Sequence, residues 1–345
     1  MNKSKERITV VPTNIITGFL GVGKTSAILH LLKSKPDNER WAVLVNEFGE
    51  IGVDGSLFQG QHSEGQEVYI REVPGGCMCC AAGLPMQIAL NQLLARAKPH
   101  RLLIEPTGLG HPIEVLEALT ADHYQDVLSI QKIITLVDAR KLEDSRYTEH
   151  ATFNQQIAIA DVIVGNKQDL YQPEHKAKLK DYAKSKAAKG VKIIFTEQGE
   201  LAMDVLDGLI PVSRQAHHHH QHHKKDNAKT SPSDDPIPSG GFIKAVNQGE
   251  GFHSIGWRFD PVKTFCRDKL AVFLNGIVAE RMKAVFITED GVYGYNLTSD
   301  ALTEIELNDC LESRIEIIAG EIPDQWEEQL FACIVNSEAL SDSVV

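Results

Sequence analysis

Residues 18–25 read Gly18-Phe19-Leu20-Gly21-Val22-Gly23-Lys24-Thr25 and fit the pattern G-x-x-x-x-G-K-[ST]. A strand-like run precedes them and a helical pattern follows, which disfavours the alternative of a glycine-rich turn with no ligand. The glycines would let backbone N–H groups approach the α- and β-phosphates, Lys24 would reach the β- and γ-phosphate oxygens, and the Thr25 hydroxyl would ligate Mg²⁺. The residues predicted to bind the nucleotide phosphates are Gly18, Gly21, Val22, Gly23, Lys24, Thr25 and Ser26.

A second segment expected near the phosphates is the apolar run 101–104, which leads into Glu105-Pro106-Thr107-Gly108. A carboxylate at the end of such a strand can hold a water bound to Mg²⁺, and Gly108 can place its N–H near a γ-phosphate. The alternative is a surface glutamate at a strand end. Lys24, Thr25 and Glu105 are therefore candidate catalytic residues.

The base-reading motif is Asn166-Lys167-Gln168-Asp169, which follows the apolar run 162–164. An aspartate there can accept hydrogen bonds from both N1–H and the 2-amino group of guanine, a pair that adenine does not offer. The sequence therefore predicts GTP rather than ATP, bound through Asn166, Lys167 and Asp169, although such a motif can also occur by chance in a turn. The segment 196–199, where a further guanine-contacting loop is expected, matches the usual S-A-K pattern poorly.

A cysteine motif, Gly75-Gly76-Cys77-Met78-Cys79-Cys80, lies in the chain between the segment 41–50 and Glu105. A helix predicted to begin near residue 84 would favour thiolates through its dipole, and three thiolates suit Zn²⁺ or Cu(I). A fourth ligand would be a distant side chain or an exchangeable water, as in a site that can release its ion. The alternatives are a redox pair or three buried cysteines.

The order of apolar runs and helical patterns between residues 8 and 210 predicts an α/β fold. Strands with few polar interruptions indicate a mostly parallel sheet covered by helices on both faces. We predict a P-loop GTPase domain over 1–210 with the cysteine motif inserted, a flexible linker over 211–240, and a small α+β domain over 241–345.

The linker has almost no apolar residues and so cannot bury enough surface to offset its ordering entropy. Its imidazoles could capture metal loosely; an expression tag or a polar linker without function are the alternatives. These candidate metal-binding histidines are His217, His218, His219, His220, His222 and His223.

In the C-terminal domain, Asp260-Pro261 is typical of an N-cap and first helical residue, so we expect a helix from there to about residue 274. The runs 284–288 and 292–297 predict a hairpin, 314–318 predicts a strand, and 324–334 predicts a closing helix.

Composition limits the partners. The chain has 345 residues with 35 Lys and Arg against 47 Asp and Glu, a net charge of −12, so non-specific nucleic-acid binding is not expected. The N-terminus is polar and no run of about 18 apolar residues occurs, which predicts a cytoplasmic protein with no membrane partner. Clustered cysteines suit a metal rather than a disulfide framework, in keeping with a reducing compartment.

Taken together, the motifs resemble the CobW-type metal-chaperone GTPases, relatives of the GTPases that insert nickel into urease and hydrogenase. G-G-C-M-C-C combined with a P-loop is highly specific, and the resemblance covers nearly the whole chain. Segments 43–50 and 103–112 look like the bacterial YeiR zinc-binding GTPase subgroup. The motifs are Gly18 to Thr25, Asn46 to Glu50, Gly75 to Cys80, Glu105 to Gly108, Asn166 to Asp169, the His-rich linker and the small C-terminal domain.

The resemblance implies zinc binding by Cys77, Cys79 and Cys80, hydrolysis of GTP to GDP and phosphate, and a role in zinc homeostasis or in metal delivery to a client metalloprotein. Two functions remain open. One is a zinc metallochaperone in which the nucleotide state changes metal affinity. The other is a zinc storage or regulatory protein in which GTP is mainly structural. A homo-oligomer that forms with metal or nucleotide is compatible with both.

This chain departs from the family pattern at two positions. Many members carry Cys where this chain has Pro106, and some carry Glu where it has Val45, so metal ligands at those positions cannot be transferred here. Glu50 is left as a candidate metal ligand. Glu47, Glu50 and Asp54 are all candidates for polarising the attacking water.

Overall fold

The computed structural model describes residues 10–45, 68–73, 84–208, 236–249, 252–307 and 309–335. The described residues divide into two compact units, one from 10 to 208 and one from 236 to 335. Most of the predicted linker, 211–235, lies outside the described residues, so the domain bounds 1–210, 211–240 and 241–345 stay a prediction.

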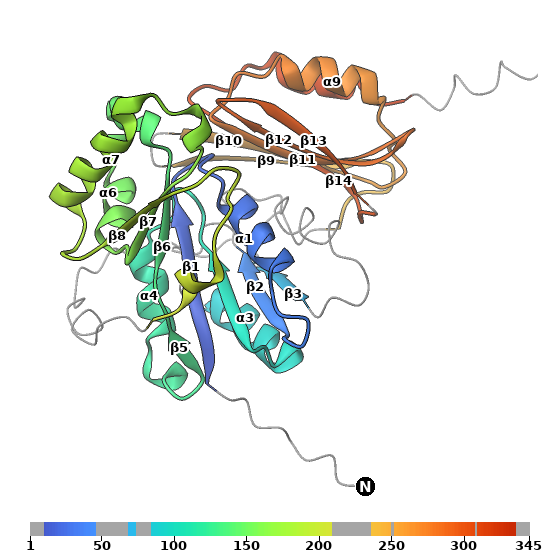
Figure 1. The fold of residues 1–345 in the computed structure, drawn as a ribbon. Coiled ribbons are helices and arrows are strands. Elements are labelled where there is room, and N and C mark those ends of the chain that lie inside the picture. The colour runs from blue at the N-terminus through green and yellow to red at the C-terminus, as the bar shows by residue number, and fades with distance from the viewer. Residues whose placement is uncertain are drawn as a thin grey trace, which may run out of the picture. The chain divides into compact units, whose positions relative to one another are not determined.

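The first unit is built on an eight-stranded sheet in the order β3-β2-β4-β1-β6-β7-β8, with β5 also pairing with β1. Every pairing in this sheet is parallel, as predicted. Figure 1 shows the strands. They are β1 (Val11–Gly18), β2 (Trp41–Val45), β3 (Val68–Glu72), β4 (Arg101–Glu105), β5 (Leu128–Ile130), β6 (Ile134–Val137), β7 (Val162–Gly165) and β8 (Lys192–Phe195).

The central strands have mostly apolar, buried residues because both faces of the sheet are covered. All five residues of β2 are 0% exposed, which a strand with one solvated face would not show. On one face, Leu90 of α3 and Val115 of α4 pack with Leu44 and Ile104. The helices of this unit are α1 (Lys24–Lys33), α3 (Leu84–Ala97), α4 (Pro112–Leu119), α5 (Ser145–Thr148), α6 (Ala151–Ala158) and α7 (Pro173–Lys186), with 3₁₀ helices at Asp122–Tyr124, Ala139–Glu143, Gln168–Leu170 and Met203–Leu206.

The second unit is a six-stranded antiparallel sheet in the order β13-β12-β11-β14-β10-β9. Its two helices pack on one face, where Leu270 and Trp326 bury Trp257, Phe286 and Ile317. This arrangement confirms the predicted α+β class. The elements are β9 (Phe242–Gly249), β10 (Phe252–Phe259), α9 (Arg267–Asn275), β11 (Arg281–Thr288), β12 (Gly291–Thr298), β13 (Leu302–Leu307), β14 (Ser313–Ala319) and α10 (Gln325–Phe331).

The predicted helix start at Asp260-Pro261 is wrong. The Asp260 carboxylate instead caps a turn, accepting hydrogen bonds from the N–H groups of Val262 at 2.9 Å and Gly240 at 2.8 Å. Phe265 is then held extended, because its N–H donates to Ile287 O at 2.9 Å and it forms bridges to neighbouring backbone. The helix therefore begins only at Arg267.

The other C-terminal predictions need smaller changes. The hairpin is confirmed, with Thr288 paired to Gly291 across a two-residue turn. The predicted closing helix is shorter than 324–334 and ends at Phe331, because Ile334 forms an antiparallel bridge with Phe265.

Candidate functional site

The loop between β1 and α1 has the backbone shape of a phosphate-binding loop. Gly18, Gly21 and Gly23 have φ values of 146°, 65° and 94°, a region that side chains disfavour. Space also requires glycine, since a Cβ would lie 2.5 Å from Leu136 O at Gly18 and 2.6 Å from Asn166 Nδ2 at Gly23. The backbone therefore bears out the phosphate-loop pattern at these positions.

Lys24 is the first residue of α1 and is only 7% exposed. Its Nζ donates to Gly18 O at 2.9 Å and to Phe19 O at 3.1 Å, so the ammonium is held within the loop. The first turn of α1 carries no acidic side chain, and Ser26 there is exposed. A cation beside a helix N-terminus is an arrangement that binds phosphate.

Thr25 and Glu105, which are 80 residues apart in the sequence, meet at this loop. The Thr25 hydroxyl donates to Glu105 Oε1 at 3.0 Å. Glu105 is 3% exposed at the end of β4, the strand beside β1. A hydroxyl and a buried carboxylate are oxygen donors of the kind that Mg²⁺ prefers, so these residues fit that ion.

The loop that follows β4, residues 105–108, lies directly against the phosphate loop. A Cβ on Gly108 would be 3.0 Å from Leu20 Cδ2 and 3.1 Å from Leu20 N. The Gly108 carbonyl accepts a hydrogen bond from Gln156 Nε2 at 3.0 Å. The sequence predicted the place of Gly108 but not its partner on α6.

Asn166 joins the base-reading motif to two other loops. It is 2% exposed, its Nδ2 donates to Val22 O at 2.8 Å, and its Oδ1 accepts from Gly199 N at 3.1 Å. The neighbouring Gln168 N–H donates to Thr196 O at 3.0 Å. The segment 196–199 therefore lies beside the motif although it departs from S-A-K.

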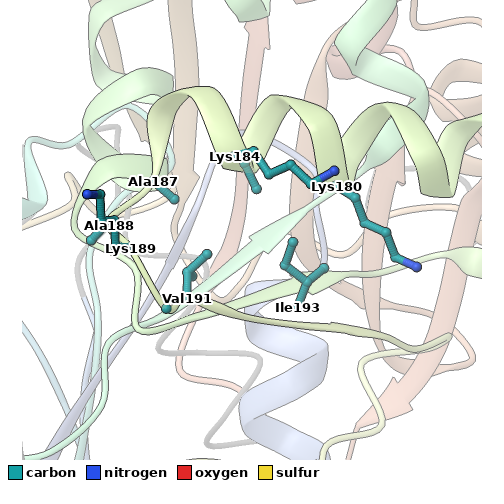
Figure 2. A pocket seen from close by; sticks show the side chains of 9 residues that line it. Lys180, Lys184, Ala187, Ala188, Lys189, Val191 and Ile193 are labelled. Carbon is teal, nitrogen blue, oxygen red and sulfur yellow. The ribbon is translucent and has the colours of Figure 1, made fainter.

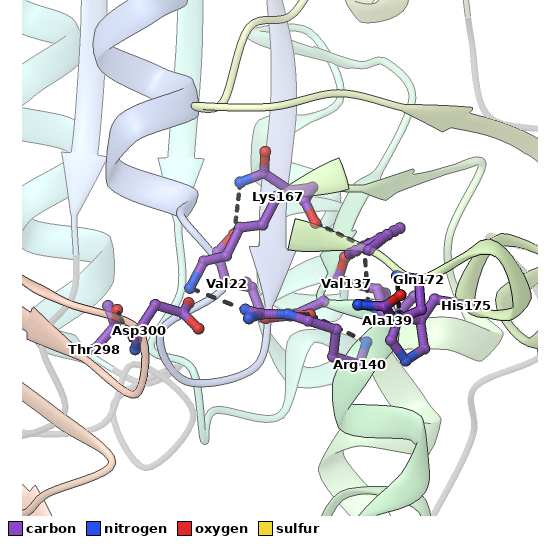
Figure 3. Close-up of polar contacts among 12 residues, drawn as sticks. Val22, Val137, Ala139, Arg140, Lys167, Gln172, His175, Thr298 and Asp300 are labelled. Carbon is purple, nitrogen blue, oxygen red and sulfur yellow. Dashed lines mark hydrogen bonds and ion pairs between the residues drawn. The ribbon is translucent and has the colours of Figure 1, made fainter. Parts of the chain in front are cut away.

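Asp169 is exposed on the short 3₁₀ helix that follows Asn166, so its carboxylate is accessible to a base. Lys167 has a left-handed backbone, with φ 61°, and its Nζ lies 4.0 Å from Asp138 Oδ2. Asp138 is 2% exposed and also accepts from Arg140 Nε at 2.9 Å (Figure 3). Sequence reasoning missed Asp138, although a carboxylate directly after a buried strand is the signal that singled out Glu105.

Tyr171 is a second residue that sequence reasoning missed. Its hydroxyl donates to Asn166 O at 2.6 Å and accepts from Ala139 N at 2.9 Å, which ties the base-reading loop to the end of β6 (Figure 3). Burial raises the pKa of the Tyr171 hydroxyl well above its usual value, so the group stays neutral.

The predicted metal residues lie outside the described residues. They are Cys77, Cys79, Cys80, Glu50 and the histidines His217–His220, His222 and His223, and Glu47 and Asp54 lie outside as well. Within the described ranges, no group of three His, Cys, Asp or Glu side chains could hold a metal ion. The cysteines of the second unit, Cys266, Cys310 and Cys333, are free thiols, and burial raises the pKa of Cys310 and of Cys333 to about 11.

A cavity of about 500 Å³ lies between the C-terminal half of α7 and β8 (Figure 2). Ala183, Val191 and Ile193 give it apolar walls, and Lys180 and Lys184 add positive charge. None of its lining residues belongs to the loops described above, so it is separate from the nucleotide site.

Among the helices that the structure describes, none has the length and apolar character needed to cross a membrane.

Comparison with known proteins agrees with this geometry. Residues 12–195 match the family model described as CobW/HypB/UreG, nucleotide-binding domain. The zinc chaperone YeiR of Escherichia coli K12 is 39% identical over 320 residues, which cover 90% of this chain and 94% of that protein. The zinc chaperone CobW of Pseudomonas aeruginosa is 30% identical over 225 residues, or 58% of this chain and 60% of that protein.

A crystal structure of the Zn(II)-bound YjiA GTPase from E. coli aligns with 95% of this chain, and 99% of that chain, at 17% identity and a TM-score of 0.41. The family model alone spans more than half of the chain and includes the loops that carry Lys24, Glu105 and Asn166. The chain therefore belongs to the CobW/HypB/UreG family.

Proposed function

We propose that this protein is a zinc-binding GTPase that hydrolyses GTP to GDP and phosphate and couples its nucleotide state to the binding or transfer of zinc. The observation that carries the proposal is the meeting of three loops, 18–25, 105–108 and 166–169, in a chain that is 39% identical, over 90% of its length, to a zinc chaperone. Zinc is the cargo in this scheme, and GTP is the substrate.

Several of the described residues support the binding of GTP. Lys24 places positive charge beside the β- and γ-phosphates, and the backbone amides that begin α1 add donors for their oxygens. Thr25 and Glu105 would hold Mg²⁺. When bound, that ion neutralises charge on the transferred phosphoryl group. Asp169 would accept the two guanine protons, and Glu47, Glu50 and Asp54 remain the candidates for orienting water.

The proposed zinc ligands are Cys77, Cys79 and Cys80, with Glu50 as a candidate fourth. In chain order the cysteines lie between the segment 46–54 and the 105–108 loop, both of which are expected to meet the γ-phosphate. A γ-phosphate that orders those segments would therefore move the thiolates. The motif needs reduced thiols, so we place the protein in the cytoplasm, where it would serve a client metalloprotein.

Thermodynamic linkage distinguishes a chaperone from a storage protein. If zinc changes the affinity for GTP by some factor, GTP must change the affinity for zinc by the same factor. Calorimetric titration of each ligand with and without the other should show this reciprocal change in the chaperone. Independent affinities in both directions, with no effect of zinc on turnover, would reject the chaperone in favour of storage.

Two variants separate the ligand sites in the same titrations. Replacing Cys77, Cys79 and Cys80 together by Ser should remove tight zinc binding and any zinc effect on hydrolysis, while GTP binding stays nearly unchanged. Lys24→Ala should do the reverse, since its ammonium lies in the phosphate loop. Tight zinc binding that survives the triple substitution would contradict the proposed ligands.

A further inference from the structure

Helix α6 and the turn before it contact the phosphate loop. The ring of Phe19, inside that loop, packs edge-on against Tyr147 and His150 with centroid distances of 4.9 and 4.8 Å, and against Phe153 of α6 at 5.8 Å. Phe19 is 0% exposed, so this aromatic cluster fixes the phosphate loop to the helix without solvent between them.

The same helix also holds the 105–108 loop. Gln156 is 1% exposed, and its Nε2 donates to Gly108 O at 3.0 Å. Its own backbone carbonyl accepts from the Thr135 hydroxyl of β6 at 2.8 Å, a separate buried hydrogen bond that does not involve the carboxamide. Because this carboxamide is shielded from water, its hydrogen bond holds the orientation of the Gly108 carbonyl more strongly than a solvent-exposed hydrogen bond would.

The orientation of the carbonyl group matters at Gly108 in particular. Glycine has the widest choice of backbone conformations, so its peptide groups can rotate unless something holds them. The negative end of the Gly108 carbonyl would repel a triphosphate if it rotated toward the phosphate loop, and the loop is close: Leu20 N lies 3.1 Å from where a Cβ of Gly108 would be.

We propose that Gln156 is the positioning residue that keeps the Gly108 carbonyl away from the triphosphate, and that α6 thereby adjusts the protein's preference for GTP over GDP. The inference rests on the proposed GTP hydrolysis, and it names the residue that makes nucleotide affinity depend on the γ-phosphate. Because GDP has no γ-phosphate, its binding depends on Lys24 and Asp169 and not on Gly108. Loss of the Gln156 contact therefore weakens GTP selectively.

The test compares Gln156→Met, which keeps the length of the side chain but has no donor, with Thr135→Val. Dissociation constants are measured for GDP and for a non-hydrolysable GTP analogue, together with kcat and the unfolding midpoint. Gln156→Met should weaken the binding of the analogue about tenfold and lower kcat, while the dissociation constant for GDP changes less than about twofold. Thr135→Val removes the other buried hydrogen bond to Gln156, so it should lower the unfolding midpoint without changing the ratio of the two dissociation constants.

A second variant keeps the inference testable if the methionine variant does not fold. Gln156→Glu preserves shape but presents an acceptor to the Gly108 carbonyl, so it should show the same selective loss at neutral pH. Burial raises the pKa of such a carboxyl, and its protonated form can donate, so affinity for the analogue should recover as the pH is lowered. Equal weakening of GDP and analogue, or no weakening, would overturn the inference. A wild-type protein that binds neither nucleotide would instead contradict the proposed function.

Discussion

We predict that base selectivity depends on one exposed side chain, that of Asp169. Asp169 lies on a short 3₁₀ helix, and its carboxylate is exposed. The loop before this helix is held in place by two contacts: the Asn166 side chain donates to Val22 O, and the Tyr171 hydroxyl donates to Asn166 O. The two oxygens of a carboxylate can accept from both N1–H and the 2-amino group of guanine at once. We therefore expect Asp169 to be the residue that discriminates between GTP and ATP.

Asp169→Asn replaces one acceptor oxygen by a donor amide. GTP affinity should fall about 100-fold, or about 3 kcal/mol, and xanthosine triphosphate, whose C2 carbonyl can accept from that amide, should bind better. Competition binding measures both changes. Asp181→Asn, an equal change of charge at an exposed site on α7, is the matched control and should leave both affinities as they are. Preference of the wild-type protein for ATP would show that the assignment of Asp169 is wrong.

Between elements, Tyr171 connects the end of β6 to the loop after β7. Tyr171→Phe would leave Ala139 N without its acceptor and Asn166 O without its donor, so the free energy of unfolding should fall by about 1–3 kcal/mol. Burial raises the pKa of this hydroxyl, so its contribution is complete below the unfolded pKa of about 10 and is lost as the pH rises further. Denaturant titrations from pH 8 to 11 should show that the difference in free energy of unfolding between the wild-type protein and the variant becomes smaller as the pH rises. A difference that stays constant would contradict this role.

Some elements could be predicted because their patterns are local. The strand β2 is apolar throughout, β4 has an apolar centre at residues 102–104, and phosphate loops have a distinctive glycine spacing, so sequence alone placed them correctly. The strands β9 and β10 were not predicted, because Lys244 in one strand and Gly256 in the other interrupt their apolar pattern. The onset of α9 was placed too early because the constraint comes from Phe265, whose partners in β11 and near Ile334 are distant in the chain.

Within the nucleotide site, too, residues in local motifs could be predicted and residues defined by distant contacts could not. Lys24, Thr25, Glu105 and Asn166 belong to motifs, and Thr25 and Glu105 indeed meet in the structure. Gln156 could not be found in this way. A glutamine on a short helix is ordinary in sequence, and its importance comes from burial against a loop 48 residues away.

At the scale of the whole chain, we predict one tight metal site at Cys77, Cys79 and Cys80 and loose metal binding by the histidines of the linker. Deleting residues 217–223 should remove several weak metal equivalents and leave one tight equivalent and the fold intact, because a segment with so few apolar residues is expected to contribute little packing. Metal counting after dialysis, with the circular dichroism spectrum as a check on folding, tests this prediction. Loss of the tight equivalent would show that the linker supplies zinc ligands directly.

The contacts of Asn166 have a consequence for how the protein is made. This side chain joins Val22, near the start of the chain, to Gly199, which follows the last strand of the first unit. Domains generally fold as units during synthesis, beginning from the N-terminus. A nascent chain on the ribosome has its phosphate loop long before it has residue 199, so it cannot form both contacts of Asn166. We therefore expect GTP to bind at full affinity only after the segment 196–199 has been synthesised and has joined the fold.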